Sequence, residues 1–498
     1  MTTLNNHKGW FDRLESFGNK IPHPLFLFST LCLIIAVTSW ILSFFNPQLV
    51  HPTTEKIVTV RSIISSEGLV YILESTINNF INFKPLGLVL SMMIAVGLME
   101  EIGLAGAAIK SVLLNAPKKF VTMTIFFVGI IGNLASDAAF VLIPPLAGII
   151  FAATKRNPIV GICTGFVAVA AGFTANIFIA GTDVLLSSVT NEVLTTVSDQ
   201  TITPAANWYF MLVSVPFIMI IGTWITEKMI EPRFPVSEAK ITQNTEETYK
   251  LSRIELRAVK ITGIYAVVFN IALLLMILPE NSPLRNSTGG LVPSPFLNGM
   301  IPIIMLFFIS CSLVYGFLAK KITKMDDIPA IMTRSLKNVG GYIILVFFVA
   351  QFIAWFNWTN LSLYLAIGGA NLLSAIEIPN TFMLILLIIL SALINLIIFS
   401  GSAQWALMAP VFIPLFVLLG MEPSAIQMAY RIGDSTTNVI SPTNPYLPMI
   451  LAMIAQYNPK FKFGTFLSIM MPYALILLTS WSILFLIYYN LGLPLGPA

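Results

Sequence analysis

The chain has few charged residues, few histidines and few cysteines for its 498 residues. Charged residues make up 10% and hydrophobic residues 56% of the sequence, whereas about a quarter of a soluble domain is typically charged. The three histidines, His7, His23 and His51, lie before or just after the first apolar run. The later apolar body therefore offers no histidine for metal binding or acid–base chemistry, which argues against a metal-dependent membrane enzyme.

The few cysteines and the modest net charge exclude further classes of protein. Cys32, Cys163 and Cys311 all fall in apolar runs, and their spacing predicts neither a disulfide framework nor a metal site. The net charge of +4 is modest and predicts no nucleic-acid partner. No P-loop motif is present, so ATP is not the expected energy source, and no cofactor is predicted.

What the chain has in abundance is apolar runs of 18 or more residues, each able to cross a hydrocarbon core of about 30 Å. The first, at 25–45, is too long for a signal-peptide core and lacks a small-residue cleavage site. The sequence therefore predicts an all-α polytopic protein of the inner (plasma) membrane, in contact with lipid.

Lysine and arginine, which collect in cytoplasmic loops, predict the topology. Basic clusters flank the apolar run 120–153 on both sides, although GNLASD interrupts its middle. We therefore expect this run to enter and return as a re-entrant hairpin from the cytoplasmic side, with its tip at 132–137. A second hairpin, at 381–419 and broken by SGSAQ, is expected to open to the outside.

The remaining runs predict nine transmembrane helices, with the N-terminus cytoplasmic and the C-terminus outside. Segments 46–82 and 358–378 are expected to be interfacial or amphipathic. The chain divides into a first repeat at 84–230, a cytoplasmic linker with scaffold spans at 231–339, and a second repeat at 340–490. The predicted spans are 24–45, 84–115, 159–190, 208–230, 260–278, 297–320, 340–357, 424–452 and 464–490.

The two halves share an internal pattern. Ser136 precedes Pro144 by eight residues in the first hairpin, and Ser402 precedes Pro410 by eight in the second. A span broken by a polar patch follows each hairpin: GFTANIFIAGTD in the first half and DSTTNVISPTN in the second. This pattern predicts inverted-topology repeats, an architecture of many secondary transporters.

Helix breaks inside a membrane suit the binding of ions and anions. Backbone there must line a cavity or water if it is not hydrogen-bonded within a helix. The N–H ends of half-helices attract carboxylates. The freed carbonyls, together with Ser, Thr and Asn oxygens, suit a hard cation such as Na⁺.

Several motifs resemble the AbgT family of p-aminobenzoyl-glutamate transporters: SGSAQWALMAP, AYRIGDSTTN, GFTANIFIAGTDVLL, TEKMIEPR and AQFIAWFNWTN. The resemblance runs nearly from end to end. It implies a dimer of nine-span protomers with two re-entrant hairpins, importing p-aminobenzoyl-glutamate or exporting sulfonamides. The chain departs from the pattern at the first hairpin tip, where some members have SNTAS. The resemblance implies functional roles for Asp183, Ser402, Trp405, Pro423, Arg431 and Asp434.

Arg431 and Asp434 are three residues apart and are expected to share a helix face. A buried structural ion pair is one interpretation. The other is functional, because charge at membrane depth is costly and usually lines a pathway. The guanidinium suits a substrate carboxylate, while Asp434 would orient it or carry a proton.

Other polar residues also have functional and structural interpretations. Asp183 is the expected second protonatable group, or a helix-end carboxylate facing water. Asp137 would bind an ion or cap the returning half-helix. Asn176 and Asn438, at matching repeat positions, are candidate ligands for the coupling ion or the substrate.

Two further residues complete the predicted site. Trp405 would stack on an aromatic ring of the substrate or pack in the core. Pro423 is expected to shape the start of the eighth span. Glu100 and Glu101 are interpreted as a helix break or an interfacial contact.

We therefore expect a secondary active transporter for p-aminobenzoyl-glutamate, related aromatic amides or sulfonamides, driven by H⁺ or Na⁺ and functioning as a homodimer. The alternatives are a Na⁺-coupled carboxylate transporter of the same architecture, a channel and, least favoured, a membrane enzyme. The sequence leaves the direction of transport and the coupling ion open.

Overall fold

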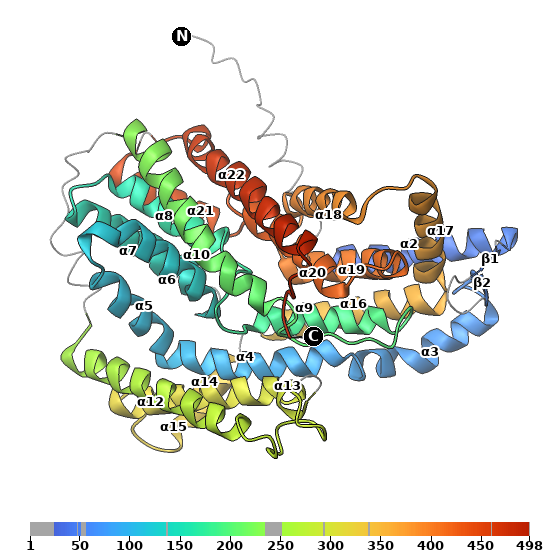
Figure 1. Cartoon of the computed structure of the whole chain (residues 1–498), viewed down its shortest axis with the longest axis horizontal. Helices are drawn as coiled ribbons and strands as arrows, with labels where there is room; N and C mark the ends of the chain where they lie inside the picture. The colour runs from blue at the N-terminus through green and yellow to red at the C-terminus, as the bar shows by residue number, and fades with distance from the viewer. Residues whose placement is uncertain are drawn as a thin grey trace, which may run out of the picture.

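A computed structural model describes residues 24–46, 48–50, 56–135, 138–234, 251–291, 294–336, 339–459 and 461–497. The described chain is predominantly helical, as predicted, and its helices lie in several layers (Figure 1). Within these residues one small sheet occurs, an antiparallel pair of β1 (Gln48–Val50) and β2 (Ile57–Thr59).

A long helical stretch crosses the molecule. It consists of α3 (Ser66–Ile81) and α4 (Lys84–Ile102), which together form one apolar run of 37 residues. The helix α4 begins at Lys84, where the predicted span begins, and α3 precedes it in the segment expected to be interfacial or amphipathic. Gly103, at φ +85°, ends α4 in the left-handed conformation that glycine adopts without strain. The chain then turns into α5 (Leu104–Leu114), so the predicted span 84–115 is two helices.

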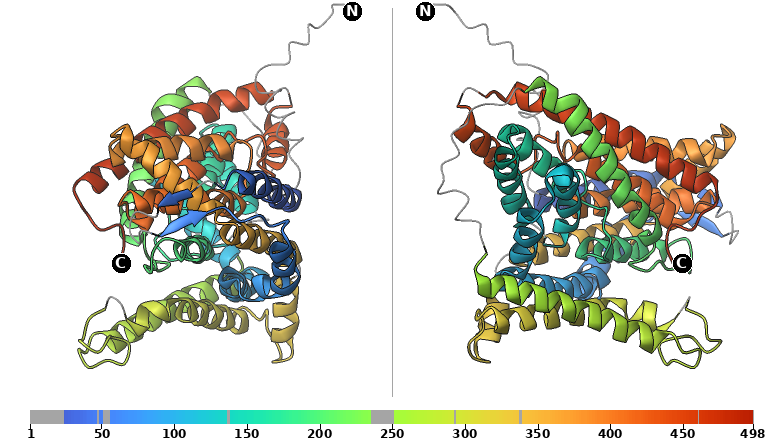
Figure 2. Two further views of the ribbon diagram at one scale, coloured as in Figure 1. Left: turned by 90° about the vertical axis from the view of Figure 1, so that its right-hand side faces the viewer. Right: turned by 60° about the vertical axis from the view of Figure 1, so that its left-hand side comes forward.

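Two groups of helices support this stretch. On one side lies an arm of α12 (Arg253–Ile277), α14 (Met300–Leu318) and α15 (Asp327–Ser335), joined through the short α13 (Pro295–Asn298) (Figure 2). The second group comprises α2 (Pro24–Phe45), α16 (Val339–Trp358) and α17 (Leu361–Ala375). Phe28 and Phe352 pack edge to face between α2 and α16.

The remaining helices repeat one order of elements. A pair of helices, a broken helix and a long helix occur once in each half. The first set is α6 (Val121–Gly132), α7 (Ala138–Ala153), α8 (Pro158–Ala170), α9 (Gly181–Leu194) and α10 (Trp208–Trp224). The second is α18 (Asn380–Asn395), α19 (Gly401–Leu418), α20 (Pro423–Thr437), α21 (Leu447–Tyr457) and α22 (Phe463–Asn490).

The two interrupted spans are broken where the polar patches predict. We call residues 171–180 the first break and residues 438–446 the second break. Of the half-helices that lead into them, α8 is buried along its whole length and α20 at every residue except Ser424. The breaks therefore lie inside the protein, where polar backbone groups can find partners other than lipid.

Glycine permits the closest helix contacts in this region. A Cβ atom on Gly433 of α20 would lie 2.4 Å from the Ile388 carbonyl oxygen of α18. No side chain fits at that distance, so glycine allows α20 to pack directly against the backbone of α18.

Eight described helical stretches are long and apolar enough to cross a membrane, or nine if the bent pair around 104–132 counts as one span. The prediction of a multi-pass helical membrane protein is confirmed. The assignment differs in detail, because α19, predicted as a hairpin arm, is itself long enough to span, whereas the broken helices are not continuous. The re-entrant path of the two helix pairs and the inversion of the repeats stay predictions.

Candidate functional site

The two breaks lie side by side and are hydrogen-bonded to each other. The Thr174 hydroxyl in the first break lies 2.6 Å from the Ser435 hydroxyl of α20. The Thr174 amide also donates to that oxygen, at 3.2 Å. At the start of the second break, the Asn438 side-chain amide donates to the Ala170 carbonyl at 3.2 Å. Residues about 260 positions apart in the sequence thus form one polar layer.

A buried ion pair joins the two broken helices. Arg431 Nη1 lies 2.6 Å from Asp183 Oδ1, and the side chains are 1% and 0% exposed. The second carboxylate oxygen of Asp183 accepts the Ala180 amide at 2.6 Å, in the first turn of α9. The described residues thus pair Arg431 with Asp183, and no ion pair between Arg431 and Asp434 is found among them. The long Arg431 side chain extends from α20 to the N-terminal end of α9, where Asp183 lies.

A central cavity of about 460 Å³ lies where the breaks and the helix pairs converge. The first break contributes Phe173 and Thr174, the second contributes Tyr446, and α20 contributes Tyr430 and Asp434. The ends of both helix pairs line it too, through Asn133 and Leu134 and through residues 399–402. Residues of α4 and Tyr342 of α16 line it as well. Four polar interruptions therefore surround one chamber, as the repeat pattern predicts.

Asp434 is a fully buried carboxylate in the cavity wall. It is 0% exposed, and neither carboxylate oxygen has a hydrogen-bond partner among the described residues. A Cβ on Gly401, the first residue of α19, would lie 3.3 Å from both oxygens. The carboxylate thus faces the N-terminal end of α19, and Tyr430 lies near the carboxylate. A buried carboxylate in this state is costly unless a proton or cation neutralises it.

Ser402, in the first turn of α19, also lines the cavity. Its hydroxyl lies 3.1 Å from the hydroxyl of Ser400, which caps the helix by accepting the Ala403 amide. A second helix begins at the same chamber, since Gly181 and Thr182 open α9 and line the wall. Two helix N-termini with nearby hydroxyls make this region favourable for an anion.

Trp405 does not line the cavity. Its side chain is 0% exposed, and its indole N–H donates to the Leu186 carbonyl at 3.2 Å and to the Thr190 hydroxyl at 3.1 Å. Its ring packs against Tyr430, with centroids 4.6 Å apart. In this conformation Trp405 supports a residue of the wall and joins α19 to α9.

The two matching asparagines have different surroundings. Asn438 is satisfied, since its oxygen accepts from Asn395 Nδ2 at 2.9 Å. Asn176 is 1% exposed, and neither its oxygen nor its nitrogen has a partner among the described residues. An orphaned buried amide normally indicates water, an ion or another ligand nearby.

Asn395 and Asn133 are polar residues that sequence reasoning missed. Asn395 Nδ2 donates to the Asp434 carbonyl at 2.7 Å, and Asn133 Nδ2 donates to the Val169 carbonyl at 3.1 Å. Each therefore ties a helix pair to the half-helix that leads into a break, and each leaves a buried Oδ1 without a described partner. A lone asparagine in an apolar run is the signal that could have identified them, since polar groups in membrane helices are costly.

Three other predictions concern single positions. Pro423 is the first residue of α20, a position that tolerates proline because no helical N–H is needed there. Asp137 and Ser136 lie outside the described residues. Glu100, interpreted above as a break or an interfacial contact, is a wall residue of the cavity, while Glu101 lies 3.6 Å from Arg334.

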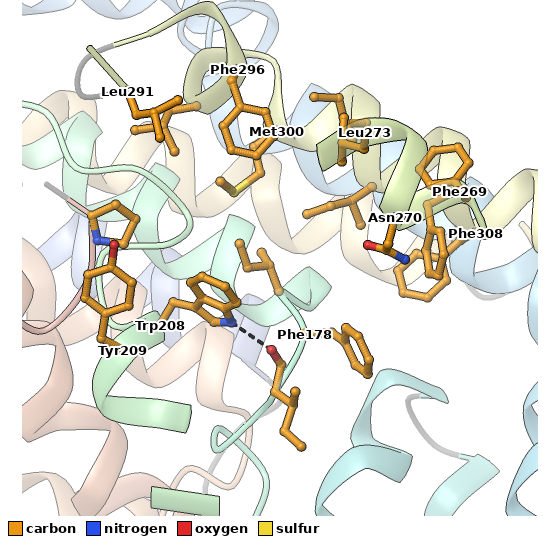
Figure 3. A pocket seen from close by; sticks show the side chains of 17 residues that line it. Phe178, Trp208, Tyr209, Phe269, Asn270, Leu273, Leu291, Phe296, Met300 and Phe308 are labelled. Atoms are coloured by element: carbon orange, nitrogen blue, oxygen red, sulfur yellow. Dashed lines mark hydrogen bonds between the residues drawn. The ribbon is translucent and has the colours of Figure 1, made fainter. Parts of the chain in front are cut away.

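A second cavity, of about 350 Å³, separates the first break from the arm. Figure 3 shows Trp208, Phe296, Met300 and Phe269 around it, with the Trp208 indole donating to the Ile177 carbonyl at 2.7 Å. No charged side chain of the described chain lines it. The central cavity, which has charged side chains in its wall, is therefore the candidate site for a charged solute.

A multi-pass protein in which two broken helices and two helix pairs enclose a polar chamber has the architecture of helical membrane transporters. Comparison with known proteins agrees. The family model described as the AbgT putative transporter family matches residues 9–498. The chain belongs to this family.

Its relatives include proteins with assigned roles. It is 37% identical to the p-aminobenzoyl-glutamate transport protein of Escherichia coli (strain K12), over 98% of this chain and 96% of the relative. Two solved structures are similar along nearly their whole length. The YdaH transporter of Alcanivorax borkumensis, described as having an unusual topology, gives a TM-score of 0.89 at 36% identity, over 96% of this chain and 100% of that one. MtrF of Neisseria gonorrhoeae, described with a class of antimetabolite efflux pumps, gives 0.92 at 34% identity, over 98% and 99%.

Proposed function

We propose that this protein is a secondary active transporter that moves p-aminobenzoyl-glutamate, a related aromatic amide or a sulfonamide across the inner membrane. An H⁺ or Na⁺ gradient drives it. The observation that carries this proposal is the Asp434 carboxylate, which has no hydrogen-bond partner within the described chain and lies in a cavity enclosed by both breaks and both helix pairs. The relatives named for p-aminobenzoyl-glutamate transport and antimetabolite efflux support the substrate class.

Asp434 is the central ion-coupling residue in this proposal. Its buried charge needs a proton or a cation, and either would leave when the cavity opens to water of low proton or sodium content. The buried side-chain oxygens of Asn395 and Asn176, which have no partner among the described residues, favour Na⁺ as the coupling ion, because hard cations take oxygen ligands. Asp183 is already paired with Arg431, so it takes part in coupling only if that pair opens.

Substrate carboxylates bind at the two helix N-termini. Ser402 and the first turn of α19 provide N–H and O–H donors, and the start of α9 faces the same chamber. Arg431 acts mainly by holding the two breaks together, and Asn438 supports it through Ala170.

Transport proceeds by alternating access. The wall of the cavity divides into α4 and α16 on one side, and the two helix pairs with the broken helices on the other. Movement of the second group against the first would open the chamber to one side of the membrane and close it to the other. The predicted inverted repeats provide the two related conformations.

Flux into proteoliposomes tests the proposal. Labelled p-aminobenzoyl-glutamate should accumulate when a pH or Na⁺ gradient is imposed, and accumulation should collapse when the gradient is dissipated. A sodium-dependent aliphatic dicarboxylate flux without aromatic amide flux would instead establish the alternative, a Na⁺-coupled carboxylate transporter of the same architecture. Flux that neither saturates nor responds to a gradient would contradict secondary transport.

A further inference from the structure

The central cavity has an aromatic side as well as a polar side. The rings of Tyr446 and Phe140 stack in parallel, with centroids 4.2 Å apart and planes 5° apart. Phe399 meets Tyr446 edge to face, at 6.5 Å and 69°. All three line the cavity, and they come from the second break, from α7 and from the segment between α18 and α19. One aromatic cluster therefore draws on both helix pairs and a break.

Further aromatic rings pack against the cluster and restrict the movement of its side chains. Phe140 is only 3% exposed and lies 6.2 Å from Phe166, which in turn lies 5.8 Å from Phe466. Tyr446 and Phe399 are the partly exposed members, and both line the chamber. A fixed aromatic surface binds a planar ring with little loss of side-chain entropy.

We infer that Tyr446 and Phe399 form the subsite for the aromatic ring of the substrate, with Phe140 positioning Tyr446. This inference rests on the proposed function and assigns the ring to a surface other than Trp405. The aryl group lies on the Tyr446–Phe399 surface, while the carboxylate end of the same molecule reaches Ser402 and the start of α19. Phe399 and Ser402 are three residues apart on either side of that helix start, so one small molecule can contact both regions.

Ligand comparison provides the first test. The purified full-length protein is titrated with p-aminobenzoyl-glutamate and with an aliphatic N-acyl glutamate that has both carboxylates but no ring. Tyr446→Leu and Phe399→Leu should each weaken binding of the aromatic ligand by about tenfold, while affinity for the aliphatic ligand changes less than twofold. Tyr446→Phe should retain aromatic binding. Phe382→Leu, at an exposed position of α18, is the matched control.

Photolabelling provides a second test that does not depend on how variants fold. p-Azidobenzoyl-glutamate places a photoreactive group on the ring itself. Irradiation and peptide mapping of the native protein should locate the adduct on the segments around residues 399 and 446. Adducts on Trp405 or Phe173 would overturn the inference, as would an unchanged preference for the aromatic ligand in the leucine variants. Neither result would contradict the proposed transport function. Absence of binding of p-aminobenzoyl-glutamate, of related aromatic amides and of sulfonamides to the wild-type protein would instead refute the proposed function.

Discussion

The Arg431 guanidinium and the Asp183 carboxylate lie 2.6 Å apart, although 248 residues separate them in the sequence. Each belongs to a different broken helix, so the pair fastens the two halves of the molecule at the level of the cavity. Both side chains are essentially inaccessible to water. Removing one partner leaves a buried charge uncompensated, whereas removing both does not.

Arg431→Met and Asp183→Leu should therefore destabilise the protein separately, each by about 3–5 kcal/mol. The double variant should recover much of this loss, because no unpaired charge remains. Thermal unfolding in detergent measures the effect, and transport should stay impaired in all three variants. Additive destabilisation in the double variant would show that the two side chains do not act as a pair.

Asp434→Asn should uncouple transport from the ion gradient. The amide is nearly isosteric with the carboxylate but needs neither a proton nor a cation to be neutral. We expect substrate exchange between equal concentrations to persist, while gradient-driven accumulation disappears. Proteoliposome accumulation and exchange measured side by side check this, and Phe382→Leu, at an exposed position of α18, provides a comparison. Full accumulation in Asp434→Asn would remove Asp434 from the coupling step.

Gly433→Ala should be strongly destabilising. The added methyl group would press on the Ile388 carbonyl and on Ser391 Cβ, so α18 and α20 must separate. Overpacking of this kind typically lowers the free energy of unfolding by about 1–3 kcal/mol. Because the contact here is with the backbone, we expect a value near the upper end of this range. Gly464→Ala in α22 is the matched control, since a Cβ added there would have no atom within 4 Å among the described residues. Equal unfolding temperatures for the two variants would contradict the close packing of α18 on α20.

Trp405→Phe should affect stability more than substrate binding. The change keeps an aromatic ring against Tyr430 but removes the N–H that donates to Leu186 and Thr190. The loss of these hydrogen bonds is expected to cost about 1 kcal/mol, with the KM of transport within twofold of wild type. A tenfold increase in KM with unchanged stability would support the stacking role that the sequence alone suggested.

The sequence was informative where polar residues interrupt apolar runs. Lys118, Lys119 and Lys155 identified the first helix pair, and the patches around Asn176 and Asn438 located both breaks. These features depend on local composition, because a polar group in a membrane helix requires a reason. The multi-pass helical class follows from the same reasoning.

Pairing across the fold could not be predicted in this way. Arg431 was matched with Asp434 because they are close in sequence, whereas the fold brings Asp183 to Arg431 from the other half. Burial of Trp405 and exposure of Tyr446 to the cavity depend on which helices pack together, and periodicity does not specify that.

The most direct test of alternating access is a reversible cross-link across the cavity. Cysteines replace Val96 of α4 and Leu185 of α9, two wall residues from the opposing groups of helices, in a variant without Cys32, Cys163 and Cys311. A control pair at Ser391 and Met408, whose side chains lie 3.9 Å apart, joins α18 to α19 within one group. Alternating access predicts that oxidation abolishes transport for the first pair, that reductant restores it, and that the control pair transports in both states. Undiminished transport by the oxidised Val96–Leu185 variant, with the cross-link verified by mass spectrometry, would contradict the proposed movement.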